Sequence, residues 1–119
     1  MDLKRRFKQI RDNYVIRQVA RLSLPDFASG PLRRCRVRFS GRVQKVGFRL
    51  EVCELAARLD LTGFCQNLED GSVLAELQGP QARIDFLISF MESLKRIKIT
   101  HKAVEARPVR PEEIGFARR

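Results

Sequence analysis

A nine-residue segment, Gly41-Arg42-Val43-Gln44-Lys45-Val46-Gly47-Phe48-Arg49, has the composition of an anion-binding loop. It follows a strand pattern and precedes a helical one. Its backbone N–H groups would therefore lie at a helix N-terminus, where they have no hydrogen-bond acceptor within the helix. The helix dipole adds partial positive charge at that point. Gly41 and Gly47 allow the main chain to come close to a ligand. The segment predicts a site for a phosphate-like group.

Arg49 supports this prediction because it falls in the first turn of the expected helix. A cation there is unfavourable by roughly 0.3–1 kcal/mol unless an anion compensates it. Its planar guanidinium can bind two phosphate oxygens at once. Taken alone, a loop with glycines and one arginine also fits an ordinary solvated loop.

The surrounding sequence predicts alternating strands and helices. Apolar and polar residues alternate over 35–40, the pattern of a half-buried strand. Helical spacing follows, and Asp70-Gly71 is a hairpin signal. In order, we expect a strand at 35–40, a helix at 48–59, strands at 62–67 and 72–78, a helix opened by Gly79-Pro80 with Ile84, Leu87, Ile88, Met91 and Leu94 inward, a strand from about Ile97 to Ala106, and a short strand at 114–117. This βαββαβ order is the ferredoxin-like α+β fold, with two helices on one face of a single sheet.

The topology brings two distant segments together. In this fold the first two strands run parallel with the third strand between them, so their carboxyl ends lie at the same edge of the sheet. We therefore expect the loop at 41–48 to lie beside Asn67, at the end of the second strand. Considered by itself, Asn67 also fits a hairpin-capping role.

The loop and the hairpin together resemble the acylphosphatase family. The family's first motif, Gly-x-Val-Gln-Gly-Val-x-Phe-Arg, is matched by residues 41–49 except at Lys45. Its second motif is matched by Gly63-Phe64-Cys65-Gln66-Asn67 and, in register, by Gly71, Val73 and Gly79. The resemblance extends from residue 35 to about 117 and implies an acylphosphatase-like domain there.

The resemblance implies a hydrolase that cleaves the carboxyl–phosphate bond of acyl phosphates without a metal or other cofactor. It makes Arg49 the phosphate-binding arginine and Asn67 the residue that positions the attacking water, the two catalytic residues. It places the phosphate against the backbone N–H groups of Val43, Gln44, Lys45, Val46, Gly47 and Phe48. An amide can orient water but is not a strong base, so a phosphate oxygen takes the proton in this scheme.

Lys45 departs from the family motif, where a glycine is usual. If this position requires a positive φ, lysine carries about 1–2 kcal/mol of strain. If it does not, the extra cation tightens phosphate binding and slows product release. Gln44 fits a solvated amide as well as a site residue. The connection Ser93-Leu94-Lys95-Arg96 also departs from the family, which often has a Gly-Pro-type turn there.

Composition limits the other classes. The chain has 119 residues, of which 44% are hydrophobic, enough for one small domain with a core. No run approaches the roughly 20 apolar residues of a membrane span. Cys35, Cys53 and Cys65 have no CxxC spacing, and one His completes no metal-ligand pattern. Three cysteines without a pairing pattern indicate reduced thiols and a cytoplasmic protein. Glu69 and Asp70 are adjacent carboxylates in the expected turn, and we expect them to form that turn rather than to act as an acid–base pair.

The formal net charge is +10, and residues 1–34 carry nine basic and three acidic side chains, which is +6 of it. We expect a basic amphipathic helical extension and linker at 1–34 and an acylphosphatase-like domain at 35–119. Within the extension we expect a helix at 2–23 whose apolar stripe is Leu3, Phe7, Ile10 and Tyr14, continued on a shifted face by Val15, Val19 and Leu22. Docking on the domain or on a second copy is favoured, then contact with an acidic membrane surface, then nucleic acid.

Two alternatives to the hydrolase remain. One is a non-catalytic anion- or nucleic-acid-binding module on the same fold, and the other is a family member that binds phosphate without turnover. RNA-recognition domains with this topology stack bases on sheet aromatics. Residues 72–78 contain no aromatic residue, which argues against RNA binding.

Overall fold

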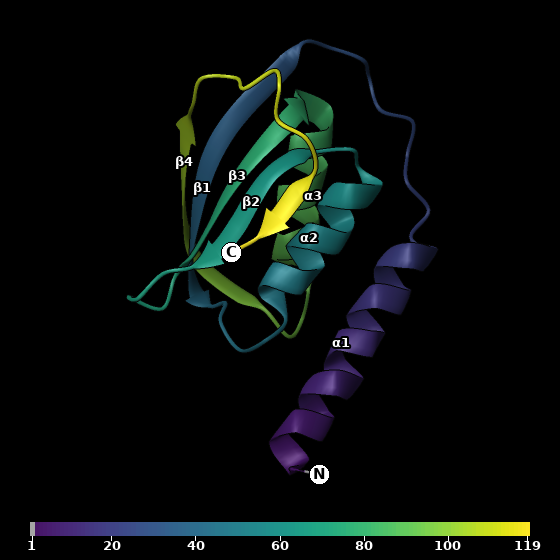
Figure 1. Cartoon of the computed structure of the whole chain (residues 1–119), viewed down its shortest axis with the longest axis vertical. Coiled ribbons are helices and arrows are strands. Elements are labelled where there is room, and N and C mark those ends of the chain that lie inside the picture. Colours follow the sequence, from purple (N-terminus) through teal and green to yellow (C-terminus); the bar gives the residue numbers. More distant parts are fainter. Residues whose placement is uncertain (1) are drawn as a thin grey trace.

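The computed structural model describes residues 2–119 as a five-stranded sheet with two helices on one face and a third helix alongside (Figure 1). The strand order is β4-β1-β3-β2-β5. The elements are α1 (Leu3–Arg21), β1 (Leu32–Arg42), α2 (Phe48–Arg58), β2 (Thr62–Asn67), β3 (Val73–Pro80), α3 (Gln81–Ser93), β4 (Lys98–Ala106) and β5 (Phe116–Arg118). The predicted ferredoxin-like α+β fold is confirmed.

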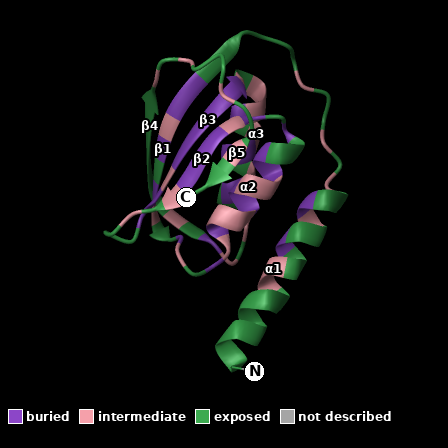
Figure 2. Cartoon of the chain, viewed as in Figure 1, coloured by how far each residue is buried: buried purple, intermediate pink, exposed green. Residues whose placement is uncertain are grey.

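The alternating pattern of β1 sorts its side chains onto two faces of the sheet. Cys35, Val37 and Phe39 are buried beneath the helices, and Phe39 packs on Phe48 of α2 with ring centroids 5.0 Å apart. β1 pairs antiparallel with β3 on one side and with β4 on the other. Because β3 also pairs with β2, β1 and β2 run parallel, as expected. Figure 2 shows this buried centre of the sheet.

β1, β3 and β5 extend beyond the ranges predicted from the sequence. β1 begins at Leu32 because Leu32 pairs with Pro80, which lengthens β3 past Gly79. Pro80 is the last residue of β3 and also precedes the first turn of α3, so it ends one element and starts the next. β5 is shifted to Phe116–Arg118, where it pairs parallel with β2.

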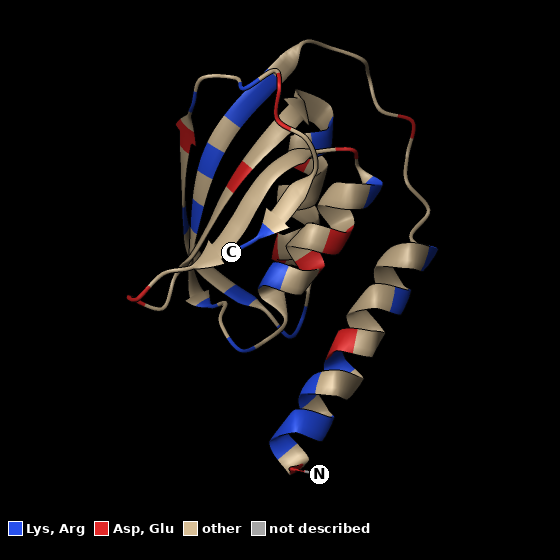
Figure 3. Ribbon diagram, in the orientation of Figure 1, with Lys and Arg blue, Asp and Glu red and all other residues tan. Residues whose placement is uncertain are grey.

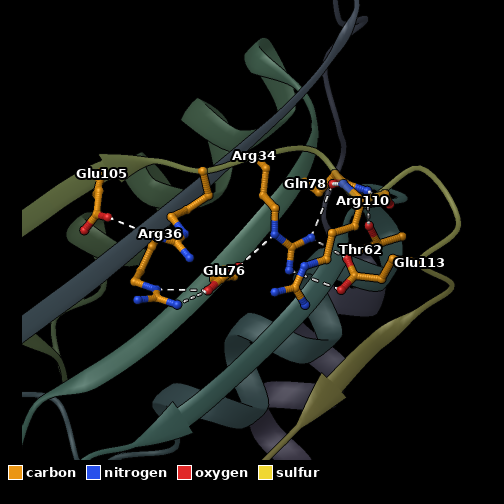
Figure 4. Close-up of polar contacts among 9 residues, drawn as sticks. Arg34, Arg36, Thr62, Glu76, Gln78, Glu105, Arg110 and Glu113 are labelled. Atoms are coloured by element: carbon orange, nitrogen blue, oxygen red, sulfur yellow. Dashed lines mark hydrogen bonds and ion pairs between the residues drawn. The ribbon is translucent and has the colours of Figure 1, made fainter.

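The outer face of the sheet carries an ion-pair network rather than an apolar surface (Figure 4). Arg34 donates from Nε to Glu76 at 2.8 Å and from Nη1 to Glu113 at 2.7 Å. Arg36 donates to the second oxygen of Glu76 at 2.6 Å. Arg34 and Glu76 are both buried, so β1 and β3 are joined by a network that is largely shielded from water.

Helix α1 docks on α2 through its shifted face. Val15 and Val19 are fully buried, while the stripe formed by Leu3, Phe7, Ile10 and Tyr14 is exposed. The predicted helix was two residues too long at its C-terminus, because Leu22 is already extended as the cap residue. No helix among residues 2–119 combines the length and apolar character needed to cross a bilayer.

Candidate active site

The loop between β1 and α2 curls through two residues in the left-handed region. Lys45 has φ +62° and Gly47, the N-cap of α2, has φ +79°. The N–H groups of residues 44–47 have no main-chain acceptor within residues 2–119. They therefore stand beside the positive end of the α2 dipole, an arrangement that suits an anion. Lys45 meets the condition under which the sequence predicted strain.

Gln44 ties this loop to the β2–β3 hairpin. Its Nε2 donates to the main-chain oxygens of Leu68 at 2.8 Å and Ser72 at 2.9 Å. The hairpin itself is closed by Leu68 N–H donating to the Ser72 oxygen at 2.9 Å. The amide thus fixes the two segments that the topology brings together, and Gln44 is half-buried rather than solvated.

Arg96 fixes the other side of the loop, and sequence reasoning missed it. Its Nε donates to the main-chain oxygen of Val46 at 2.8 Å, and its Nη2 donates to Glu51 at 2.7 Å. Glu51 is fully buried in the first turn of α2. Burial raises the pKa of the Glu51 carboxyl, and its contact with Arg96 opposes that rise. The unusual connection before β4 therefore supplies the side chain that holds the loop.

Arg49 leaves the first turn of α2 and donates from Nη1 to the main-chain oxygen of Arg119 at 2.9 Å. Arg119 is itself held by two contacts. Its main-chain N–H donates to the main-chain oxygen of Cys65 at 2.9 Å, and its guanidinium carbon lies 3.8 Å from the centroid of the Phe64 ring. The segment that follows β5 thus positions Arg49. No pattern in the sequence indicates this contact, since the two residues lie 70 positions apart.

A cavity of about 220 Å³ forms where these elements meet. Six predicted site residues line it: Val43, Lys45, Gly47, Phe48, Arg49 and Asn67. Gln44 and Val46 belong to the same loop but do not line the cavity. Four further residues complete the lining, namely Lys8, Arg11, Leu50 and Arg118. The structure therefore brings Arg49 and Asn67 to one cavity from α2 and from the end of β2.

Helix α1 reaches this cavity, which the sequence did not indicate. Arg11 donates from Nη1 to the main-chain oxygen of Lys45 at 3.1 Å, and a Cβ at Gly47 would come within 3.0 Å of Arg11 Nε. Lys8 lies one turn earlier on the same helix. In Figure 3 the basic first half of α1 lies at the same end of the molecule as the loop.

Other reactive side chains stay away from this chemistry. Burial raises the pKa of the Cys35 and Cys53 thiols to about 11 each, and burial raises the pKa of Cys65 still more strongly. A thiol with so high a pKa is protonated at neutral pH and is a poor nucleophile. His101 is exposed on β4. Within residues 2–119, no three His, Cys, Asp or Glu side chains gather as a metal site would require.

Comparisons with known proteins identify the family of this chain. The acylphosphatase family model matches residues 35–117. The acylphosphatase of Geobacillus thermodenitrificans is 36% identical over 86 residues, which cover 71% of this chain and 92% of the relative. A solved acylphosphatase structure from Coxiella burnetii has a TM-score of 0.68 at 28% identity, covering 74% of this chain and 93% of that one. The Bacillus subtilis enzyme has a TM-score of 0.67 at 27% identity, with 73% and 97% covered.

These matches and the fold show that the chain belongs to the acylphosphatase family, and it is a hydrolase of that class. The resemblance noted from the two sequence motifs is confirmed over residues 35–117. Helix α1 lies outside the matched region.

Proposed function

We propose that this chain hydrolyses acyl phosphates at the cavity between the β1–α2 loop and the end of β2. The observation that carries the proposal is that Arg49 and Asn67 line one small cavity together with the loop. The backbone N–H groups of residues 43–48 and the Arg49 guanidinium hold the phosphoryl group, while Asn67 orients a water molecule on its far side. Gln44 and Arg96 keep the loop in its binding shape.

The reaction needs positioning and charge balance more than strong acid–base chemistry. The oriented water attacks phosphorus, the bond between phosphorus and the acyl oxygen breaks, and its electron pair leaves with the carboxylate. The water proton passes to a phosphoryl oxygen, so the products are a carboxylate and inorganic phosphate. A carboxylate is a good leaving group, and phosphoryl transfer of this kind depends on orientation and electrostatics.

We propose that this reaction is independent of a metal. The charge that a bound cation would balance is met in this scheme by Arg49, the loop N–H groups and the α2 dipole. Lys45 and Arg118 add positive charge in the same cavity. We also propose a cytoplasmic location, which is supported by three free cysteines.

The alternative, a nucleic-acid-binding module, is less well supported by the outer sheet face. Each basic residue of β1 on that face pairs with a carboxylate. Arg34 pairs with Glu76 and Glu113, Arg36 pairs with Glu76, and Arg38 pairs with Asp70. The aromatic residue Phe64 lies beneath Arg119. Cations that are already paired with carboxylates bind phosphates weakly, and an aromatic ring that is already covered cannot stack on a base.

The test is hydrolysis of benzoyl phosphate in the presence of a chelator. Arg49→Gln and Asn67→Ala should each lower kcat/KM by about 10²–10³-fold, the usual effect of losing one preorganised group. Arg33→Gln and Asn13→Ala are matched controls, because both residues are exposed and neither lines the cavity. They should behave as wild type.

Two results would overturn the assignment of roles. A folded wild-type chain without turnover would point to a phosphate-binding relative that lacks catalysis. Equal activity in wild type, Arg49→Gln and Asn67→Ala would place the reaction elsewhere. Activity that appears only when a divalent cation is added back would reject the metal-independent scheme alone.

A further inference from the structure

The cavity carries more positive charge than one phosphoryl group requires. Its lining includes the cations Lys8, Arg11, Lys45, Arg49 and Arg118, and no carboxylate. A phosphoryl group carries a charge of about −2 at neutral pH, which Arg49 and the N–H groups of the loop already oppose. The cations of the outer sheet face, Arg34, Arg36 and Arg38, differ from these because each is paired with a carboxylate.

Not all of the cavity cations are available to a ligand. Arg11 is engaged twice: Nε and Nη2 donate to Asp12 at 3.1 and 2.9 Å, and Nη1 donates to the Lys45 main chain. Lys8, Lys45 and Arg118, by contrast, form no ion pair within residues 2–119. These three side chains are the ones a second anionic group would meet.

Lys8 is held near the cavity by the docking of α1. Val15 and Val19 are buried against the domain. Arg58 of α2 donates from Nη1 to the main-chain oxygens of Val19 at 2.6 Å and Leu22 at 2.9 Å, which caps the end of α1. Arg11 supplies the second attachment, one turn from Lys8. A helix fixed at two points holds the backbone of Lys8 beside the cavity, so that a ligand has to order only its side chain.

We propose that Lys8, with Lys45 and Arg118, forms a second anion subsite at the mouth of the phosphate cavity, so that this chain prefers acyl phosphates whose acyl part carries its own negative charge. A carboxylate or a second phosphate on the acyl group would fill it. Clefts lined by charges of one sign favour ligands of the opposite sign. The inference rests on the proposed function and adds the substrate class.

The competing explanation is that the additional cations only strengthen the grip on the phosphoryl group. A pair of substrates separates the two: 4-carboxybenzoyl phosphate and 4-carbamoylbenzoyl phosphate have the same size and the same phosphoryl group, and differ in the charge of the acyl part. The wild-type chain should show the higher kcat/KM for the carboxylate. Lys8→Gln should reduce that preference by roughly fivefold, the upper range for a solvent-exposed charge pair.

Arg6→Gln is the matched control, since Arg6 is an exposed cation on α1 that does not line the cavity. It should leave the preference unchanged. Raising the salt concentration from about 0.02 M to about 0.5 M should also lower the wild-type preference, because the subsite is open to solvent and screening is strong there.

A binding measurement keeps this test separate from catalysis. (4-Carboxyphenacyl)phosphonate and (4-carbamoylphenacyl)phosphonate have a CH2 group in place of the bridging oxygen and are not hydrolysed, and calorimetry should show that Lys8→Gln weakens the binding of the carboxylate compound more than that of the amide. If Lys8→Gln lowers kcat/KM for both substrates by the same factor, or binding of both phosphonates equally, the cations serve the phosphoryl group and the subsite is rejected. If the wild type binds the carboxylate phosphonate selectively but hydrolyses neither substrate, the proposed function fails while the subsite stands.

Discussion

The Arg96 guanidinium donates from Nη2 to the buried carboxylate of Glu51 at 2.7 Å, and this pair connects the segment between α3 and β4 to the first turn of α2. The Nε of the same guanidinium donates to the main-chain oxygen of Val46. One side chain therefore compensates a buried charge and holds the anion-binding loop. Stability and loop geometry are coupled at this point.

Replacing Arg96 with methionine should destabilise the fold by about 3 kcal/mol, because it leaves Glu51 buried without its partner. Chemical denaturation measures this loss. The double variant Arg96→Met with Glu51→Gln should recover most of the stability, since neither charge is then left unpaired. The kcat/KM should stay low in the double variant, because the Val46 carbonyl is still released. A double variant no more stable than Arg96→Met would contradict the pairing.

The Arg96→Met deficit should also depend on pH. Burial raises the pKa of Glu51, and removing Arg96 would raise that pKa further. A carboxyl group whose pKa is raised in the folded state destabilises the fold when it ionises. The free energy of unfolding therefore falls as pH rises from the group's ordinary pKa of 4.5 through its folded-state pKa. The stability difference between wild type and Arg96→Met should therefore widen between about pH 4.5 and pH 8. A difference that narrows over this range would show that another group dominates.

Lys45 allows strain and charge to be separated. Its φ of +62° costs lysine about 1 kcal/mol relative to a residue that accepts the left-handed region. Lys45→Gly should relieve this strain, with part of the gain offset by the greater freedom of the unfolded chain. Lys45→Gln keeps a side chain that is strained in this backbone conformation and removes the charge. Both variants should lose part of the preference for 4-carboxybenzoyl phosphate over its amide, and only Lys45→Gly should gain stability; an unchanged preference in both would make the cation irrelevant to the subsite.

The outer sheet network predicts the response to acid. Burial opposes the charge of Glu76, but hydrogen bonds from Arg34 and Arg36 outweigh it and lower the pKa of that carboxyl. Arg34 lowers the pKa of Glu113 in the same way. A lowered carboxyl pKa gives stability that is present above 4.5 and is lost as pH falls through the folded-state value. Glu76→Gln should cost about 3 kcal/mol at pH 7, and denaturation at decreasing pH should show that cost shrinking.

The sequence predicted those parts of the site that depend on local pattern. Strand alternation, the glycine loop and the Asp70-Gly71 hairpin are short-range signals, and together they place Arg49 near Asn67 through the topology alone. The contacts of Arg96, Arg11 and Arg119 depend on long side chains that cross between elements. Their partners are main-chain oxygens, which every residue possesses, so no residue pattern marks them.

Helix α1 shows the same limit. Two apolar faces were visible in the sequence, one from Leu3 to Tyr14 and one formed by Val15, Val19 and Leu22, and the pattern did not indicate which of them docks. The structure buries Val15 and Val19 instead. Which face of α1 docks depends on the positions of Arg58 and of the exposed end of α2. The sequence of α1 carries no information about those positions. The role of the exposed face stays a prediction.

That face predicts a measurable affinity for anionic lipid. Leu3, Phe7, Ile10 and Tyr14 are between 57% and 66% exposed on a helix that also carries several unpaired cations. An apolar stripe beside basic residues binds the interface of acidic membranes. The chain should sediment with vesicles containing phosphatidylserine and not with phosphatidylcholine alone, and Phe7→Ser with Ile10→Ser should abolish sedimentation. Equal sedimentation with both kinds of vesicle would reject selective binding of anionic lipid, and the contribution of α1 would then be the one it makes at the cavity.

Removing the cap on α1 gives the last prediction. Arg58 donates to three main-chain oxygens at the end of this helix, those of Val19, Ala20 and Leu22. Arg58→Met keeps the apolar length of the side chain but loses these hydrogen bonds, so α1 should detach more often while the sheet stays folded. Hydrogen exchange should become faster in residues 11–21 and remain slow in β1 and β3. Because Lys8 and Arg11 depend on this docking, the variant should also lose the preference for 4-carboxybenzoyl phosphate. Unchanged exchange in α1 would mean that Val15 and Val19 suffice to hold it.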